Sequence, residues 1–121
     1  MEIVLPATAE APAAARRALE PLRGTTHPAL LADLALVVSE LVSNSVRHGP
    51  GGPITLRLVA ASPSHVRGEV EDDGDGTVAI RSAAAGAKPG GGGHGLRILD
   101  VVASRWGVHA GSTHVWFELC Y

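Results

Sequence analysis

Short segments of the chain alternate apolar with polar residues, the pattern of a β-strand that buries one face. The clearest pair flanks a Ser-Pro-Ser turn at residues 62–64, with Ile54, Leu56 and Leu58 on one face of the first strand. An apolar run near the start of the chain is closed by Pro6 and predicts an edge strand. The strands predicted in this way are residues 2–5, 54–58, 66–71, 106–109 and 113–119.

Three further segments have the composition and apolar spacing of helices, at residues 8–23, 26–48 and 95–104. In the first, Thr8 is a candidate cap, although the sequence also allows a start at Ala11. Pro21 is expected to end or kink that helix. In the second, Thr25 or Thr26 offers the cap, and a Gly-Pro pair stops the helix after residue 48.

The order of these elements, β-α-α-β-β-loop-α-β-β, predicts an α/β (α+β) sandwich of two layers. Its sheet is expected to be mixed and largely antiparallel, with the helices packed on one face. Residues 1–121 are expected to form a single domain. Residues 77–92 are rich in Ala and Gly and predict a mobile loop.

Composition and charge exclude several classes of function. Only 3% of residues are aromatic and the formal net charge is −2, so direct binding of nucleic acid has little support. Cys120 is the only cysteine, which excludes an internal disulfide and fits a reducing compartment. We recognise no signal peptide and judge no apolar stretch long enough to span a membrane. We therefore expect a small soluble cytoplasmic domain.

The second predicted helix carries Glu40 and Asn44 four residues apart, which places the carboxylate beside the carboxamide. An amide oxygen is a good ligand for Mg²⁺, and a nearby carboxylate can accept a proton from an attacking hydroxyl. Such a pair suits phosphate chemistry. The alternative is a solvated polar face, and for an isolated Glu-x-x-x-Asn that alternative is the more common one.

The segment Asp72-Asp-Gly-Asp-Gly76 follows a predicted strand and can be interpreted in two ways. Gly-Asp-Gly favours a tight turn whatever the function. However, strand alternation puts Asp72 on the core-facing row with Val66 and Val70, where a turn needs no acid. Asp72 would there accept a hydrogen bond from an exocyclic amine, while Gly74 and Gly76 let the backbone approach the base.

The glycine-rich segment from residue 90 to residue 96 is neither a dinucleotide motif, because no strand precedes it, nor a P-loop, because it lacks Gly-x-x-x-x-Gly-Lys-Ser/Thr. It leads instead into a helix that starts near Gly95, whose amide groups favour phosphate. The alternative is a plain glycine linker. His48 and His94 flank the predicted pocket and are candidates only for accessory phosphate donors. Four histidines, His48, His94, His109 and His114, have no zinc-site spacing, and lone histidines are usually surface or hairpin residues, so metal binding by histidine has little support from the sequence.

These three clusters, in this order and over nearly the whole chain, resemble the GHKL ATPase/kinase superfamily with its Bergerat-type ATP-binding fold. Within it the chain is similar to the small stand-alone anti-sigma-factor serine kinases of bacteria. The resemblance implies that Asn44 holds Mg²⁺ on the ATP phosphates, Glu40 acts as the catalytic residue, and Asp72 recognises adenine. It also implies an ATP lid at residues 77–92. The implied nucleotide-binding residues are Asn44, Arg47, His48, Asp72, Gly74, Gly76, Gly93, His94, Gly95, Leu96 and Thr113.

The implied function is a Mg²⁺-dependent protein-serine kinase that phosphorylates an anti-sigma-factor antagonist and sequesters a sigma factor, thereby regulating transcription. Members of that group often carry a basic residue near the end of the lid, where this chain has glycine at residues 90–93, with Lys88 before them and Arg97 after them. ATP binding is therefore better supported than phosphotransfer. The alternatives are a non-enzymatic ATP-dependent regulator and, last, a detached sensor-kinase domain that phosphorylates histidine. The resemblance leaves a homodimer open.

Overall fold

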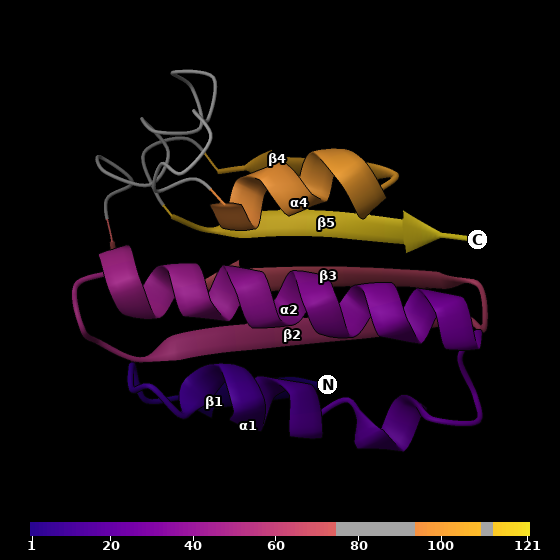
Figure 1. The fold of residues 1–121 in the computed structure, drawn as a ribbon, viewed down its shortest axis with the longest axis horizontal. Helices are drawn as coiled ribbons and strands as arrows, with labels where there is room; N and C mark the ends of the chain where they lie inside the picture. The colour runs from indigo at the N-terminus through magenta and orange to yellow at the C-terminus, as the bar shows by residue number, and fades with distance from the viewer. Residues whose placement is uncertain (75–93, 110–112) are drawn as a thin grey trace.

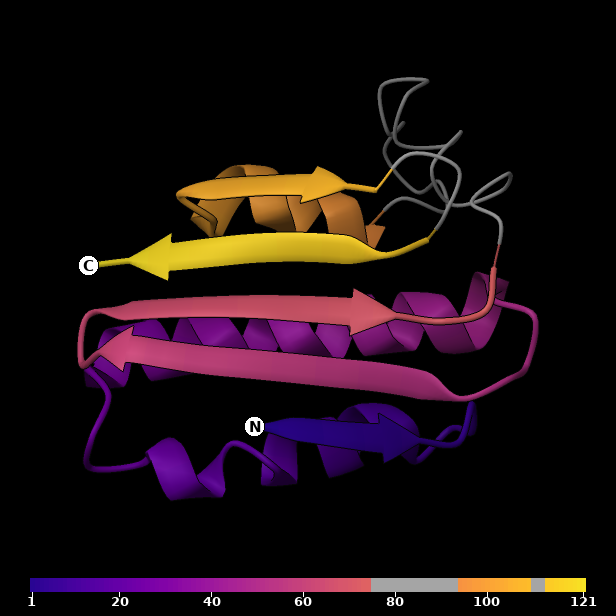
Figure 2. The same ribbon diagram turned by 180° about the vertical axis from the view of Figure 1, so that it is seen from behind.

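The sheet places all the predicted strands side by side. In the computed structural model, which describes residues 1–74, 94–109 and 113–121, five strands follow the order β1-β2-β3-β5-β4, and every pair of neighbours is antiparallel. Figure 2 shows the sheet from the side that the helices leave open. The strands are β1 (Glu2–Leu5), β2 (Ile54–Ser62), β3 (His65–Glu71), β4 (Arg105–Val108) and β5 (Val115–Cys120). The prediction of an edge strand at β1 is confirmed.

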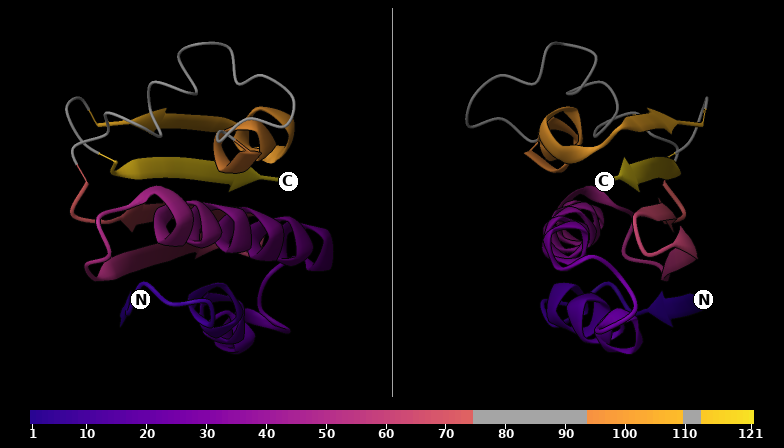
Figure 3. Two further views of the ribbon diagram at one scale, coloured as in Figure 1. Left: turned by 60° about the vertical axis from the view of Figure 1, so that its left-hand side comes forward. Right: turned by 90° about the vertical axis from the view of Figure 1, so that its right-hand side faces the viewer.

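The described helices all lie on one face of this sheet, as Figures 1 and 3 show. They are α1 (Ala11–Arg17), the short 3₁₀ helix η1 (Glu20–Leu22), α2 (Pro28–His48) and α4 (His94–Val102). The long α2 lies across the middle of the sheet, with α1 on one side and α4 on the other (Figure 1). The predicted two-layer α+β architecture is therefore confirmed. The expected lid at 77–92 lies outside the described residues.

The sequence allowed the observed start of the first helix but not that of the second. The first helix begins at Ala11, the alternative to a cap at Thr8, because a proline in its first turn fixes the backbone there without any capping side chain. Neither Thr25 nor Thr26 caps α2. Instead the Nδ1 atom of His27 accepts a hydrogen bond of 3.1 Å from the backbone N–H of Ala29. The hydroxyl of Thr25 is already used, since it donates to the last carbonyl of η1.

The core lies between α2 and the inner face of the sheet. By length and hydropathy α2 meets the requirement for a membrane span, with 21 residues and a mean hydropathy of 1.6 in its most apolar window. The expectation that no apolar stretch is long enough was therefore wrong. In this fold, however, one face of α2 packs inside the protein, against strands such as β3 and β5, while Leu36 on another face is exposed. Those buried completely are Leu30, Leu34, Val37, Val38 and Val42.

A glycine inside β3 allows the largest core side chain to fit. Gly68 belongs to the buried row of the strand, and the ring of Phe117 on β5 occupies the space where a Cβ atom would project. A Cβ at this position would also lie 2.8 Å from Cδ2 of Leu58 on β2. Because Phe117 and Leu58 are themselves buried, neither can move away without disturbing the packing around it.

We therefore expect Gly68→Ala to lower the free energy of unfolding by about 1–3 kcal/mol, the usual range for overpacking a core. Urea unfolding followed by circular dichroism measures the change. Val59→Thr, at an exposed position of the neighbouring β2, is the control and should stay within about 0.5 kcal/mol of the parent. Equal midpoints for Gly68→Ala and the parent protein would contradict the packing argument.

Candidate functional site

Asp72 continues the buried row of β3 one residue beyond the end of that strand. Its side chain is buried, with 8% of the residue exposed, as the strand alternation predicts. Its Oδ1 atom accepts a 2.7 Å hydrogen bond from the backbone N–H of Gly74 and a second hydrogen bond from the hydroxyl of Thr113. Thr113 reaches this position because β3 and β5 pair with Val70 opposite Val115. The structure thus brings together three of the predicted site residues.

Gly49, the residue that ends α2, faces the other oxygen of the same carboxylate. A Cβ atom at Gly49 would lie 3.0 Å from Oδ2 of Asp72, so a larger residue would push the carboxylate away. Both hydrogen bonds that described residues donate to Asp72 go to Oδ1. The carboxylate is therefore oriented by Gly74 and Thr113 and approached closely by the end of α2. In the sequence we interpreted Gly49 only as a helix stop and missed this contact.

Asn44 belongs to α2 and lies five residues before Gly49. This separation corresponds to roughly 7.5 Å along a helix axis. Only 8% of the residue is exposed. Among the described residues, none forms a hydrogen bond with its Oδ1 atom, which is itself buried. A buried carbonyl oxygen without a partner is unfavourable, and such oxygens are usually satisfied by water, an ion or a ligand. Asn44 therefore fits the predicted role of a Mg²⁺ ligand.

Glu40 lies one helical turn before Asn44 and lines an open cleft of about 300 Å³ between α2 and α4. Arg97 of α4 lines the same cleft, so the two walls carry opposite charges. The remaining lining is apolar and comes from Leu36, Ile98 and Val101. Neither Asn44 nor Asp72 is among the described residues that line the cleft. Among the described residues, Glu40 therefore lines an opening one helical turn from Asn44, and the sequence did not predict that Arg97 lines it too.

The remaining predicted residues lie around the ends of α2 and α4. Arg47 is exposed and donates a 2.7 Å hydrogen bond to the hydroxyl of Ser43, and His48 is the half-buried last residue of α2. Residues 94–96, which include the predicted His94, Gly95 and Leu96, form the first turn of α4 and are described by their backbone alone. The predicted Gly76 and Gly93 lie outside the described residues.

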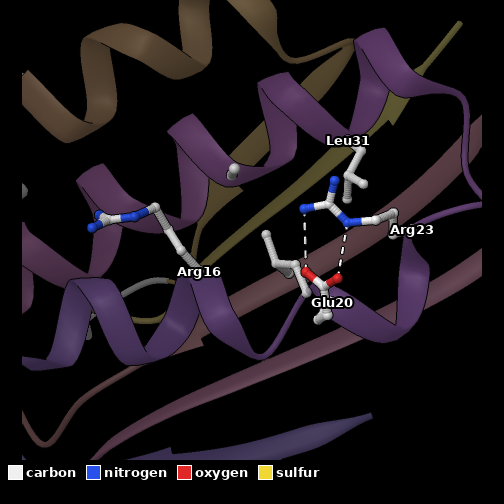
Figure 4. A pocket seen from close by; sticks show the side chains of 6 residues that line it. Arg16, Glu20, Arg23 and Leu31 are labelled. Carbon is white, nitrogen blue, oxygen red and sulfur yellow. Dashed lines mark hydrogen bonds and ion pairs between the residues drawn. The ribbon is translucent and has the colours of Figure 1, made fainter.

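A second, smaller pocket of about 80 Å³ lies between α1, η1 and α2, away from the predicted site (Figure 4). Its guanidinium groups are already engaged. Arg23 forms a two-point ion pair with Glu20, with distances of 2.9 and 3.2 Å, and Figure 4 shows the two side chains facing each other. Arg16 points away from that pair and donates to the hydroxyl of Ser39. This pocket contains none of the predicted functional residues.

Fold and comparisons agree on the class of protein, an ATPase domain with a two-layer α+β architecture. The family model described as the histidine kinase-like ATPase domain matches residues 5–119, so the chain belongs to this family, and membership implies ATP binding. The resemblance drawn from the sequence is thus confirmed at the level of the family. A search of curated proteins finds no match.

Among solved structures, the fold is similar to that of the RsbU and RsbW domains of Rv1364c from Mycobacterium tuberculosis. The TM-score is 0.69 at 24% sequence identity, with 100% of this chain and 31% of that chain covered. The present chain therefore spans less than a third of the length of the protein it matches. At this level of identity the likeness establishes the fold.

If Asp72 recognises adenine, Asp72→Asn should weaken ATP binding by about tenfold or more, since a hydrogen bond to a charged group contributes about 1.5–3 kcal/mol. GTP should be affected much less, because its base presents no amine at the same position. Calorimetric titration with both nucleotides measures the change. Asp73→Asn, at the exposed neighbouring acid, is the matched control. An equal loss for ATP and GTP would overturn the adenine assignment.

Proposed function

We propose that this chain binds Mg²⁺–ATP and transfers the γ-phosphoryl group to a serine of a partner protein. One observation carries the nucleotide site. The carboxylate of Asp72 is buried and oriented by Thr113 and Gly74, and the helix end beside it carries the buried amide of Asn44. Family membership identifies the nucleotide as ATP.

Asp72 and Asn44 each have one role in nucleotide binding. Asp72 accepts a hydrogen bond from the exocyclic amine of adenine, which fixes the base at the end of β3. The Oδ1 atom of Asn44 gains the partner that described residues do not provide when it coordinates Mg²⁺. A Mg²⁺ ion held by Asn44 would offset negative charge on the phosphate oxygens.

The cleft beside Glu40 receives the substrate serine. The serine Oγ attacks the γ-phosphorus, the bond between that phosphorus and the bridging oxygen of ADP breaks, and the hydroxyl proton passes to the carboxylate of Glu40. Arg97 lines the same cleft and supplies a cation to offset the charge of the transferring phosphoryl group. Arg97 thus takes the role of the basic residue that is missing from the glycine segment before α4.

The class of partner follows from the sequence resemblance. On that basis the substrate is an anti-sigma-factor antagonist, the protein also binds a sigma factor, and it acts in the cytoplasm. The cleft suits a protein substrate, because the cleft is open and its lining combines apolar side chains with one acidic and one basic residue. A regulator that binds ATP without phosphotransfer would keep the Asp72 site and have no need for Glu40.

The first test concerns Asn44 and measures thermal stability. A ligand that binds only the folded state at one hundred times its dissociation constant stabilises it by about 2.7 kcal/mol, so Mg²⁺–ATP should raise the melting temperature. In Asn44→Ala this rise should shrink strongly. Asp33→Ala, at a position eleven residues earlier on α2, should respond like the parent. An undiminished rise in Asn44→Ala would remove Asn44 from the site.

The second test concerns transfer. Glu40→Gln should lower the rate of phosphoserine formation on the antagonist by about 10²–10⁴-fold, the usual range for loss of a general base. It should leave ATP affinity nearly unchanged. Asp33→Asn, another acid on α2, is the matched control. Mass spectrometry locates the phosphoserine. ATP binding without any phosphate transfer in the parent protein would favour the non-enzymatic regulator.

A further inference from the structure

The outer face of the sheet, which the helices leave open, brings three potential metal ligands together at one end. Glu69 belongs to the outer row of β3. His114 immediately precedes β5, and His109 immediately follows β4. One ligand atom from each of these three side chains lies within 4.8 Å of the other two. None of the three belongs to the predicted nucleotide site, which uses the inner face.

The two histidines are fixed by the pairing of their strands. The backbone N–H of His109 donates a 2.9 Å hydrogen bond to the carbonyl of His114. This bond extends the β4–β5 ladder one step beyond the pair of Val108 and Val115. The imidazole rings are neighbours, with centroids 4.1 Å apart and planes inclined by 38°. Their ligand atoms are therefore close before any metal binds.

A second carboxylate lies near one of these rings. The Nε2 atom of His114 lies 3.4 Å from Oε2 of Glu69, and its Nδ1 atom lies 4.0 Å from Oε2 of Glu71. One ring nitrogen therefore faces the cluster and the other faces a separate acid. Histidines that bind metals commonly donate their second N–H to a carboxylate, which fixes the tautomer and makes the coordinating nitrogen more basic.

We propose that Glu69, His109 and His114 bind a divalent transition-metal cation, Zn²⁺ being the best fit, with Glu71 orienting His114. Two imidazoles and one carboxylate suit Zn²⁺ better than Mg²⁺ or Ca²⁺, which prefer oxygen ligands. Zn²⁺ binds nitrogen and oxygen at about 2.0–2.2 Å, so tetrahedral ligands lie roughly 3.3–3.5 Å apart. Small side-chain rotations bring the cluster to that spacing. The fourth position takes water.

The charges around Glu69 leave it available as a ligand. Arg57 and Arg67 each approach its carboxylate only to 3.8 Å, farther than the 3.4 Å to His114. The main partners of Arg57 are Glu71, at 3.0 Å, and then Glu2, at 2.8 Å, and their hydrogen bonds raise the pKa of its guanidinium. Among the described residues, His114 is thus closer to the Glu69 carboxylate than either guanidinium, and the carboxylate of Glu71 lies on the Nδ1 side of the same imidazole.

In a second cluster on the same face, arginine side chains already pair with the carboxylate. His65, Glu118 and Cys120 also have ligand atoms within 4.8 Å of one another. However, Arg105 lies 2.8 Å from the Glu118 carboxylate and Arg67 lies 3.4 Å from it. Hydrogen bonds from His65 and then Arg105 lower the pKa of Glu118. A metal ion would have to displace these cations, so this cluster provides the control.

The test titrates the full chain with Zn²⁺ at pH 7.5 against a chromophoric chelator. One Zn²⁺ should bind per chain, and His109→Ala, at an exposed position, should lower the affinity by about a hundredfold. His114→Ala should do the same, and Glu71→Gln should lower it by about 10–100-fold. His65→Ala should bind like the parent. Affinity should fall below about pH 6.5, because protonated imidazole cannot coordinate.

Cobalt(II) substitution identifies the ligands independently. A site built from Glu69, His109 and His114 should show no thiolate-to-metal charge-transfer absorption, whereas a site that includes Cys120 would show it. Thiolate absorption, unchanged Zn²⁺ affinity in both His109→Ala and His114→Ala, or loss of binding in His65→Ala would each overturn the proposal. Circular dichroism of every variant establishes that the fold is retained.

Discussion

The burial of α2 against the inner face of the sheet is the constraint on which the rest of the structure depends. Leu34, Val38 and Val42 are completely buried, so the rotation of the helix about its axis is fixed by the core. Because the helix repeats every 3.6 residues, this rotation also fixes the directions of Glu40 and Asn44. The positions of these two polar side chains are therefore a consequence of packing.

The pairing of β3 with β5 has a similar effect at the other side of the site. Alternation along each strand sends Asp72 and Thr113 to the inner face and Glu71 and His114 to the outer face. At each of these strand ends, two consecutive residues therefore face different environments. The inner pair is shielded and hydrogen-bonded, while the outer pair lies among exposed charges.

Periodicity in the sequence was enough to predict the strands, the long helix and the inward direction of Asp72, because each depends on residues close together in the chain. It could not reveal the bond between Asp72 and Thr113, which joins residues 41 positions apart and depends on the strand register. The tight approach of Gly49 and the position of Arg97 across the cleft likewise depend on how α2 and α4 pack. The cap at His27 was missed because histidine seldom has that role.

Residues on the two faces of the strand ends are consecutive in the chain. Thr113, which donates a hydrogen bond to the carboxylate of Asp72, is the residue before His114, which belongs to the outer cluster. A cation that holds His114 against Glu69 would restrain β5 relative to β3, and the same restraint limits the motion of Thr113 relative to Asp72. If the two sites are coupled in this way, linkage requires reciprocity: whatever factor the cation adds to nucleotide affinity, the nucleotide adds to cation affinity.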